Sequence, residues 1–334
     1  MNVFVSACLR TVVQSDAGFA LRALLVCSLL IISGAVVAEQ NRILVLGGIK
    51  TANRDVNEAL EPMAAFVRQH ISEIGVDDVV VVTATDREHL AQLIRHGRVD
   101  WISQTAYNAS YFLKNADVSV LSRSWRGGTP TYKSVFFVRK DSALDSLDHL
   151  DDHSIAFEHP YSTSAYFVPK IELEARGKNL VRQLDDAMVD ATSSDKKDVN
   201  YRFSKSEYNT ALWVQKGIVD VGVINDSCWR NPNVVPDSLR DDFRIVHETG
   251  DVVRALELVR SDLDADIKAR LSQLLQSMHD SERTEAVRSA YFDTQRFDAP
   301  TQDDIQRLHE FSLYSGFGTS NDGSEDHIIS RGDR

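Results

Sequence analysis

Three consecutive hydroxyl residues, Ser162, Thr163 and Ser164, are the side chains in this sequence with the clearest chemical use. The apolar run Ser154–Phe157 before them predicts a short buried strand, and apolar residues at helical spacing after them predict an amphipathic helix that ends at Gly177. The start of a helix offers unpaired N–H groups and the positive end of the helix dipole. One hydroxyl is enough to cap a helix, so three of them predict a seat for a tetrahedral oxyanion. The alternative is an ordinary N-cap with a serine-rich approach.

Alternating strands and helices before this hydroxyl segment, Ser162–Ser164, must position the rest of the site. Their order predicts a parallel sheet with helices packed on it. The expected strands are 43–46, 79–82 and 99–103, and the expected helices are 55–74 and 86–96, with Asp86 as an N-cap. Gly47 and Gly48 are expected to end the first strand in a turn. Open α/β sheets bind ligands beyond the carboxyl ends of their strands, so loops 47–53 and 104–108 are candidate ligand loops.

The hydroxyl segment, with Pro160 before it and Tyr166 and Pro169 after it, resembles a signature of the phosphate/phosphite/phosphonate-binding components of ABC transporters. The similarity spans about residues 43 to 290. It implies an α/β, two-lobed periplasmic-binding-protein (type II) fold with two hinge crossovers. The implied boundaries are 39–139 plus 248–317 for lobe 1 and 140–247 for lobe 2. In this family the Ser-Thr-Ser run holds the ligand oxygens, and Ala165 stands here where glycine is usual.

Further ligand contacts are implied by the same resemblance. Tyr107 corresponds to a family tyrosine, although Gln104 and Thr105 replace the Gly-Pro that usually precedes it, which could alter ligand choice. Tyr132 lies in the Tyr-Lys-Ser sequence that leads into strand 135–138 and the first hinge. Each tyrosine has an alternative role in packing: Tyr107 within its helix and Tyr132 at the hinge.

Two acidic residues of the second lobe complete the candidate ligand set. Glu207 begins a predicted helix, without the histidine usual in the family, and Asp226 lies in the loop after strand 219–224. The resemblance implies that such carboxylates face the ammonium group of an amino-bearing phosphonate. The alternatives are a helix cap at Ser206-Glu207 and a turn aspartate at position 226.

The N-terminus has the organisation of an export signal. Arg10 and Arg22 precede the apolar run 23–32, and small residues follow it up to Ala38. Residues 1–38 are therefore predicted to be a cleaved signal peptide that delivers the protein to the periplasm, with an uncleaved anchor as the alternative. Cys228 is the one cysteine after this segment, so no internal disulfide is expected. The polar segments 191–200 and 318–334 are expected to be a surface insertion and a disordered tail.

The net charge of the chain and the motifs that it lacks argue against two kinds of site, one for nucleic acid and one for a metal ion. The chain carries a net charge of −12, which argues against nucleic-acid binding, and no spacing of Cys and His suggests a metal site. No cofactor is expected. The predicted partners are a small oxyanion and the membrane permease of an ABC transporter, and the protein is expected to be a monomer.

Two alternatives to transport remain at this point. The first is a periplasmic sensor domain that binds a similar anion. The second is a serine hydrolase with a nucleophile in the hydroxyl segment. Against the hydrolase, the sequence has no Gly-x-Ser-x-Gly and no evident acid partner for His159, so the protein is not expected to be an enzyme.

Overall fold

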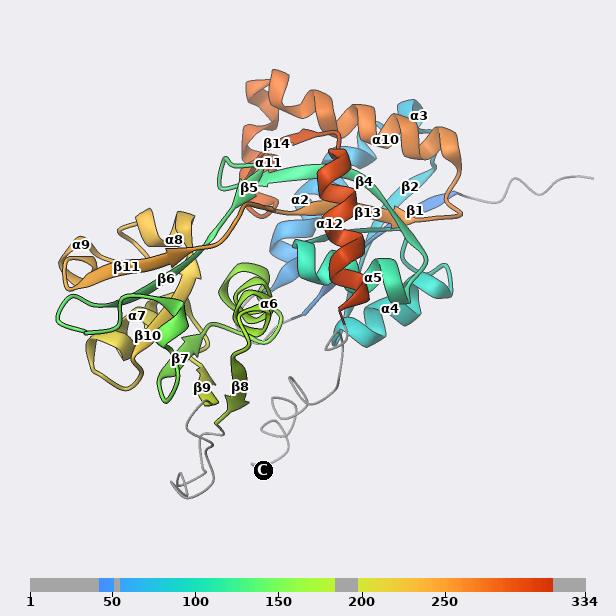
Figure 1. The fold of residues 1–334 in the computed structure, drawn as a ribbon. Helices are drawn as coiled ribbons and strands as arrows, with labels where there is room; N and C mark the ends of the chain where they lie inside the picture. Colours follow the sequence, from blue (N-terminus) through green and yellow to red (C-terminus); the bar gives the residue numbers. More distant parts are fainter. Residues whose placement is uncertain (1–41, 51–54, 184–197, 315–334) are drawn as a thin grey trace, which may run out of the picture. The chain divides into compact units, whose positions relative to one another are not determined.

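Two six-stranded sheets form the framework of the protein (Figure 1). The computed structural model describes residues 42–50, 55–183 and 198–314. Four predicted segments lie wholly or partly outside the described residues: the signal peptide 1–38, residues 51–53 of the candidate ligand loop 47–53, most of the polar segment 191–200, and the tail 318–334. Within the described part of the chain, none of the helices is long and apolar enough to span a membrane.

The first sheet has the strand order β14-β4-β13-β3-β1-β2. Its strands are β1 (Ile43–Ile49), β2 (Asp78–Ala84), β3 (Trp101–Gln104), β4 (Val118–Arg126), β13 (Leu256–Arg260) and β14 (Thr294–Asp298). β1 pairs in parallel with both β2 and β3, so the parallel sheet expected for the first hundred residues is confirmed. β13 returns from the far end of the sequence and pairs antiparallel with β3 and β4.

Helices cover both faces of this first sheet. They are α2 (Val56–Arg68), α3 (Ile71–Ile74), α4 (Arg87–Arg95), α5 (Ala106–Asn115), α10 (Ala265–Ser277), α11 (Glu285–Ala290) and α12 (Gln302–Leu313), with short 3-10 turns at Met278–Asp280 and Glu282–Thr284. One apolar core includes residues of α4, α5 and α12, and the other includes residues of α2, α3 and α10. Asp86 caps α4 as predicted, because its Oδ1 accepts a 2.7 Å bond from His89 N. The single helix expected over 55–74 is instead α2 and α3, separated at Gln69 and His70.

Gly47 and Gly48 do not form the predicted turn. β1 continues through both residues to Ile49. A Cβ atom on Gly47 would lie 2.5 Å from Val99 Cγ1, and one on Gly48 would lie 2.8 Å from Leu60 Cδ1. The glycines are therefore needed for close packing on both faces of an interior strand, and were wrongly predicted to end it.

The second sheet has the order β11-β6-β10-β7-β9-β8. Its strands are β6 (Ser134–Arg139), β7 (Ser154–Phe157), β8 (Asn179–Arg182), β9 (Asp198–Phe203), β10 (Val221–Asn225) and β11 (Phe243–Glu248). Its helical elements are a 3-10 turn at Leu147–His149, a π-helical turn at Thr163–Phe167, α6 (Val168–Ala175), α7 (Glu207–Gln215), α8 (Asp226–Arg230) and α9 (Asp237–Arg240). β6 belongs to this sheet because it pairs with β10 and β11, although the sequence analysis assigned residues up to 139 to the first lobe. β8 and β9 were not foreseen.

Two crossovers join the sheets. Residues 127–133 lead from β4 to β6, and residues 249–255 lead from β11 back to β13. They meet as a small antiparallel ribbon in which β5 (Thr131–Tyr132) pairs with β12 (Val252–Val253). This arrangement confirms the α/β, two-lobed fold with two crossovers, whereas the exact lobe limits stay a prediction.

Candidate functional site

The candidate residues lie at strand ends that face the crossovers. Gln104 is the last residue of β3, and Thr105 and Tyr107 follow it into α5. The hydroxyl segment follows β7, Glu207 follows β9, and Asp226 follows β10. Carboxyl ends of strands are the usual ligand-binding edge of open α/β sheets.

Ser162 is an N-cap. Its Oγ accepts a 3.2 Å bond from Ala165 N at the start of the π-helical turn Thr163–Phe167, and α6 continues directly from that turn. Its hydroxyl also hydrogen-bonds the carboxyl of Glu158. Both the capping alternative and the helix start required for an oxyanion site are therefore present. The first N–H groups of this helix, those of Thr163 and Ser164, have no carbonyl one turn earlier to bond within the helix.

Thr163 joins the two sheets. Its Oγ1 accepts a 3.0 Å bond from Tyr107 N and donates a 3.0 Å bond to Thr105 Oγ1. Tyr107 N is one of the unpaired donors in the first turn of α5, so the threonine satisfies it. Thr163 and Ser164 are both buried. The structure thus brings together three predicted ligand residues from two separate elements.

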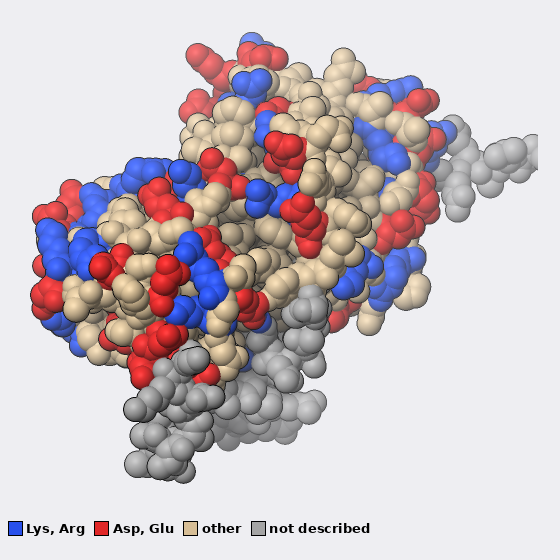
Figure 2. All heavy atoms as spheres, viewed as in Figure 1, with Lys and Arg blue, Asp and Glu red and all other residues tan. Residues whose placement is uncertain are grey.

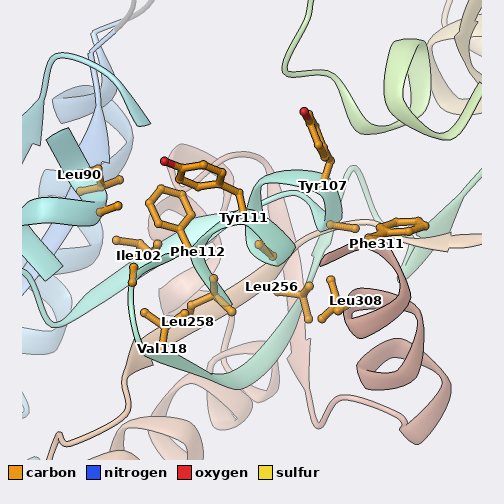
Figure 3. Packing of buried hydrophobic residues seen from close by; sticks show 14 of the residues in the cluster. Leu90, Ile102, Tyr107, Tyr111, Phe112, Val118, Leu256, Leu258, Leu308 and Phe311 are labelled. Atoms are coloured by element: carbon orange, nitrogen blue, oxygen red, sulfur yellow. The ribbon is translucent and has the colours of Figure 1, made fainter. Parts of the chain in front are cut away.

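Tyr107 is used in packing. Its ring stacks on Phe167 with centroids 3.9 Å apart and an interplanar angle of 15°. Phe167 in turn contacts Phe311 of α12 at 5.1 Å and belongs to the apolar core of the first sheet. Figure 3 shows Tyr107 at the edge of that core. These contacts match the alternative in which Tyr107 has a packing role. A ligand contact by Tyr107 stays a prediction.

An arginine that sequence reasoning missed lies beside this contact. Arg87, the first residue of α4, has its guanidinium 4.0 Å from the ring centroid of Tyr111 and 4.7 Å from that of Tyr161. Asn108 donates a 3.2 Å bond to the carbonyl of Tyr161. A polar residue at a helix start carries no sequence signal for such a cation–π contact, because its aromatic partners lie 24 and 74 residues away.

Tyr132 lies within the crossover ribbon. It is 2% exposed and is paired with Val252. The guanidinium of Arg254 lies 4.4 Å from its ring centroid. Its hinge-packing alternative therefore matches its surroundings, and Arg254 enters as a residue that sequence reasoning did not consider.

Two carboxyl groups share the second sheet's edge. Burial raises the pKa of Glu158 to about 7, the charge of Glu207 adds to the rise, and Ser162 and Arg254 oppose it. Burial also raises the pKa of Glu207, although bonds from Cys228 and Asn225 and the charge of Arg254 act against it. Ser206, rather than Glu207, caps α7. Glu158 was not recognised as a candidate, because only the fold places it beside a second carboxylate.

Asp226 is bound to the first crossover. Its Oδ1 accepts a 3.1 Å bond from Lys133 N, and its other oxygen forms an ion pair with Arg230 one helical turn later. These contacts fix the start of β6 and of α8. They match the turn-aspartate alternative, and a ligand contact by Asp226 stays a prediction.

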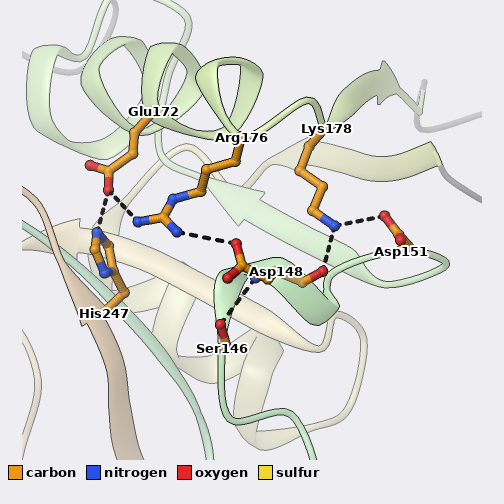
Figure 4. A network of polar contacts seen from close by, with 7 residues as sticks. All are labelled: Ser146, Asp148, Asp151, Glu172, Arg176, Lys178 and His247. Atoms are coloured by element: carbon orange, nitrogen blue, oxygen red, sulfur yellow. Dashed lines mark hydrogen bonds and ion pairs between the residues drawn. The ribbon is translucent and has the colours of Figure 1, made fainter.

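The helix after the hydroxyl segment is anchored at its far end by charged side chains (Figure 4). Arg176 forms ion pairs with Glu172 at 3.1 Å and Asp148 at 3.2 Å, and Glu172 also accepts a bond from His247 of β11. Lys178 bonds Asp151 at 2.8 Å and the carbonyl of Asp148. This network holds the C-terminal end of α6 against the second sheet. The contacts of Ser162 and Thr163 fix the other end of the helical segment.

Acidic and basic side chains are interspersed over the visible face in Figure 2. Among the described residues, no group of three or more His, Cys, Asp or Glu side chains is placed to hold a metal ion.

Comparisons with known proteins agree with this geometry. A family model described as "ABC transporter, phosphonate, periplasmic substrate-binding protein" matches residues 50–305. Two structures of XAC2383 from Xanthomonas citri, one bound to chloride and one to ATP, are 30% identical in sequence, with TM-scores of 0.73 and 0.72. The alignments cover 81% of this chain and 96% and 95% of that protein.

A more distant relative shares the fold. PhnD1 from Prochlorococcus marinus, solved with methylphosphonate, is 18% identical with a TM-score of 0.57, over 81% of this chain and 97% of that one. None of the curated proteins compared with the chain matches it.

Proposed function

From the premise that this chain belongs to the periplasmic substrate-binding proteins of phosphonate ABC transporters, we propose that it holds the oxyanion of its ligand at the hydroxyl segment. The family gives the general function: a periplasmic protein binds a small phosphonate-type ligand and works with a membrane permease. The proposal adds the residues that make the contact and the ligand chemistry.

The observation that carries the proposal is the position of Thr163. It lies at the start of a helix on one lobe and contacts the start of α5 on the other. A small anion bound there would receive N–H groups from the helix start and hydroxyl groups from Ser162, Thr163 and Ser164. Because Ser162 and Thr163 already bond protein groups, the anion must exchange with those bonds, and closure of the lobes is coupled to that exchange.

The ligand end opposite the oxyanion is proposed to face Glu207 and Glu158. Their raised pKa values indicate two carboxyls that are costly to ionise together, and an ammonium group would lower that cost. Asp226 is a weaker candidate for this role because Arg230 already neutralises it. Gln104, Thr105, Tyr107 and Tyr132 are proposed to line the ligand from the first lobe and the crossover.

The remaining proposals concern the mature protein. Residues 1–38 are proposed to be removed during export, which takes away two arginines and one aspartate and leaves a net charge of −13. The protein is proposed to act as a monomer, without binding nucleic acid and without catalysis.

A thermal-shift assay tests the proposed site. Phosphate, phosphite, methylphosphonate and 2-aminoethylphosphonate are compared as ligands of the purified protein. At least one is expected to raise Tm, by mass action on the folded state. The double variant Ser162→Ala/Thr163→Ala is expected to abolish that rise, and an unchanged rise in the variant would reject the site. Turnover of an ester or phosphate-ester substrate by the wild-type protein would instead favour the hydrolase alternative.

A further inference from the structure

Two arginines come together where the crossovers leave the first sheet. Arg126 is the last residue of β4, and Arg254 lies in the second crossover. Backbone bonds hold the segments side by side: Arg254 N donates to the carbonyl of Pro130 at 2.8 Å, and Ser124 N donates to that of Ala255 at 3.0 Å. These two residues are called here the crossover arginines.

Arg254 is only partly satisfied by the protein. Its guanidinium lies over the ring of Tyr132, but its Nε is buried and has no hydrogen-bond partner among the described residues. No ion pair to Arg254 is found in the described part of the chain, although its charge reaches Glu158 and Glu207. It therefore lies between the crossover and the edge of the second sheet that carries the hydroxyl segment.

The donors of Arg126 are also only partly satisfied by the protein. Its Nη2 donates a 2.8 Å bond to Ser103 Oγ, its guanidinium lies 4.3 Å from the ring centroid of Phe292, and its Nε is buried without a partner among the described residues. The carboxylate with the strongest charge interaction with Arg126 is that of Glu257. It already accepts bonds from Trp101, Ser103, Ser124 and Tyr291. Glu257 is thus occupied by other donors and does not supply the missing acceptor.

The two positive charges oppose each other. Burial lowers the pKa of Arg126 to about 10, and the charge of Arg254 contributes to the lowering. Buried N–H donors without acceptors are costly, and so are two guanidinium groups close together in a water-poor setting. An anion between them would satisfy the donors and reduce the repulsion, because guanidinium nitrogens bind phosphate oxygens in pairs.

We propose that the crossover arginines form a second anion subsite, which binds a second negatively charged group of the ligand whose first group is held at the hydroxyl segment. The substrate class is then a small organic molecule or inorganic ion with two phosphoryl-type groups, of which pyrophosphate is the simplest probe. An ammonium group that faces Glu158 and Glu207 is compatible with this class but is not required by it. The inference rests on the proposed function, because it takes the hydroxyl segment as the first seat. It also places ligand recognition on the crossovers that join the two sheets.

Isothermal titration of the purified full-length protein with pyrophosphate, phosphate and methylphosphonate tests the subsite. Wild-type protein is expected to bind pyrophosphate at least about tenfold more tightly than either single anion, since one charge-assisted contact contributes roughly that factor. Arg254→Gln is expected to remove this advantage while it leaves methylphosphonate affinity within about twofold. Arg126→Lys, which keeps the charge but loses the paired nitrogens, is expected to reduce the advantage in the same direction.

Arg296→Gln is the matched control. Arg296 is exposed on β14 and stacks on Trp125, the residue before Arg126, at 5.2 Å, so the variant removes the same charge from a stacked arginine that is not buried. It should leave all three affinities unchanged.

The outcomes separate the two proposals. Equal wild-type affinity for pyrophosphate and methylphosphonate overturns the subsite and leaves the hydroxyl seat standing. Equal weakening of both ligands by Arg254→Gln also overturns it, because Arg254 would then belong to the first seat. Pyrophosphate binding that depends on Arg254, without any methylphosphonate binding, retains the subsite and rejects the proposed ligand of the first seat. Absence of binding by all three anions rejects both.

Discussion

The hydroxyl segment and the crossover arginines differ in whether their hydrogen-bonding groups already have partners within the protein. Ser162 and Thr163 have partners on both sides: Ser162 with Ala165 and Glu158, and Thr163 with two residues of the other lobe. The Nε atoms of Arg126 and Arg254 are buried and have no partner within the described residues. The segment with the recognisable motif is thus already bonded within the protein, while the residues without a motif retain unused donors.

The motif thus has a structural role in addition to the binding role proposed for it. The bonds of Thr163 tie the lobes together, and an anion at the helix start would have to compete with them. At the crossovers an anion would not compete for the Nε donors of Arg126 and Arg254, because these have no partner among the described residues. The hydroxyl segment should therefore govern how the lobes meet, and the crossover arginines should add affinity with little effect on the fold.

The largest expected effect comes from the contact that accompanies the hydroxyl segment. Phe167→Ala should reduce the free energy of unfolding by about 3 to 5 kcal/mol, because it removes a buried ring that lies in the core of the other lobe. Urea unfolding followed by circular dichroism measures this change. Leu313→Ala, at a side chain that is 68% exposed, is the control and should alter stability by less than about 0.5 kcal/mol. A loss of similar size in both variants would mean that Phe167 does not join the lobes.

A middle-sized effect is expected from the carboxyl pair that lies between the two regions. The folded chain holds the proton of Glu158 to about pH 7, whereas the unfolded chain releases it near its ordinary value of 4.5. The folded state thus binds more protons in this interval, so the contribution of Glu158 to stability is fully present below about pH 4.5 and is lost as the pH rises toward 7. Glu158→Gln should flatten this fall by about 1 to 3 kcal/mol, measured as the free energy of unfolding at pH 5 and pH 7.5.

Two comparisons sharpen this test. Glu207→Gln should also flatten the profile, because the pKa of Glu207 is raised and the two charges act on each other. A profile of the Glu158→Gln variant that is parallel to wild type would show that Glu158 ionises in the folded protein as it does in water. The carboxyl pair would then be too well solvated to select an ammonium group.

The fold could be predicted from the sequence where the signals were local. Short apolar runs predicted the parallel strands β1 to β3, a period-3.6 pattern with an N-cap predicted α4, and the family resemblance predicted the two lobes. Gly47 and Gly48 were misread, because a glycine required by close packing on both faces of a strand looks the same as a glycine in a turn. β8 and β9 were missed because β8 precedes and β9 overlaps the polar segment 191–200, and both carry short, mixed patterns.

The candidate site, like the fold, was predicted where its signals lie in neighbouring residues and missed where they do not. The helix start at the hydroxyl segment was predicted, since caps and apolar spacing are written in neighbouring residues. Arg87, Arg126, Arg254 and Glu158 were not, since their relevance depends on partners far away in the chain or on the lack of one. Burial without a partner is a property of the folded protein, and no spacing in the sequence encodes it.

The smallest expected effect separates the two roles of Ser162 directly. Ser162 and Ser206 are both N-caps, and each Oγ accepts a 3.2 Å bond from the backbone three residues later. Ser162→Ala and Ser206→Ala should therefore each reduce the free energy of unfolding by about 1 kcal/mol. Only Ser162→Ala should also reduce the rise in Tm that methylphosphonate produces, because Ser206 begins a different helix. Equal ligand responses in the two variants would leave Ser162 with its capping role alone, and the oxyanion would then have to be held by Thr163, Ser164 and the helix N–H groups.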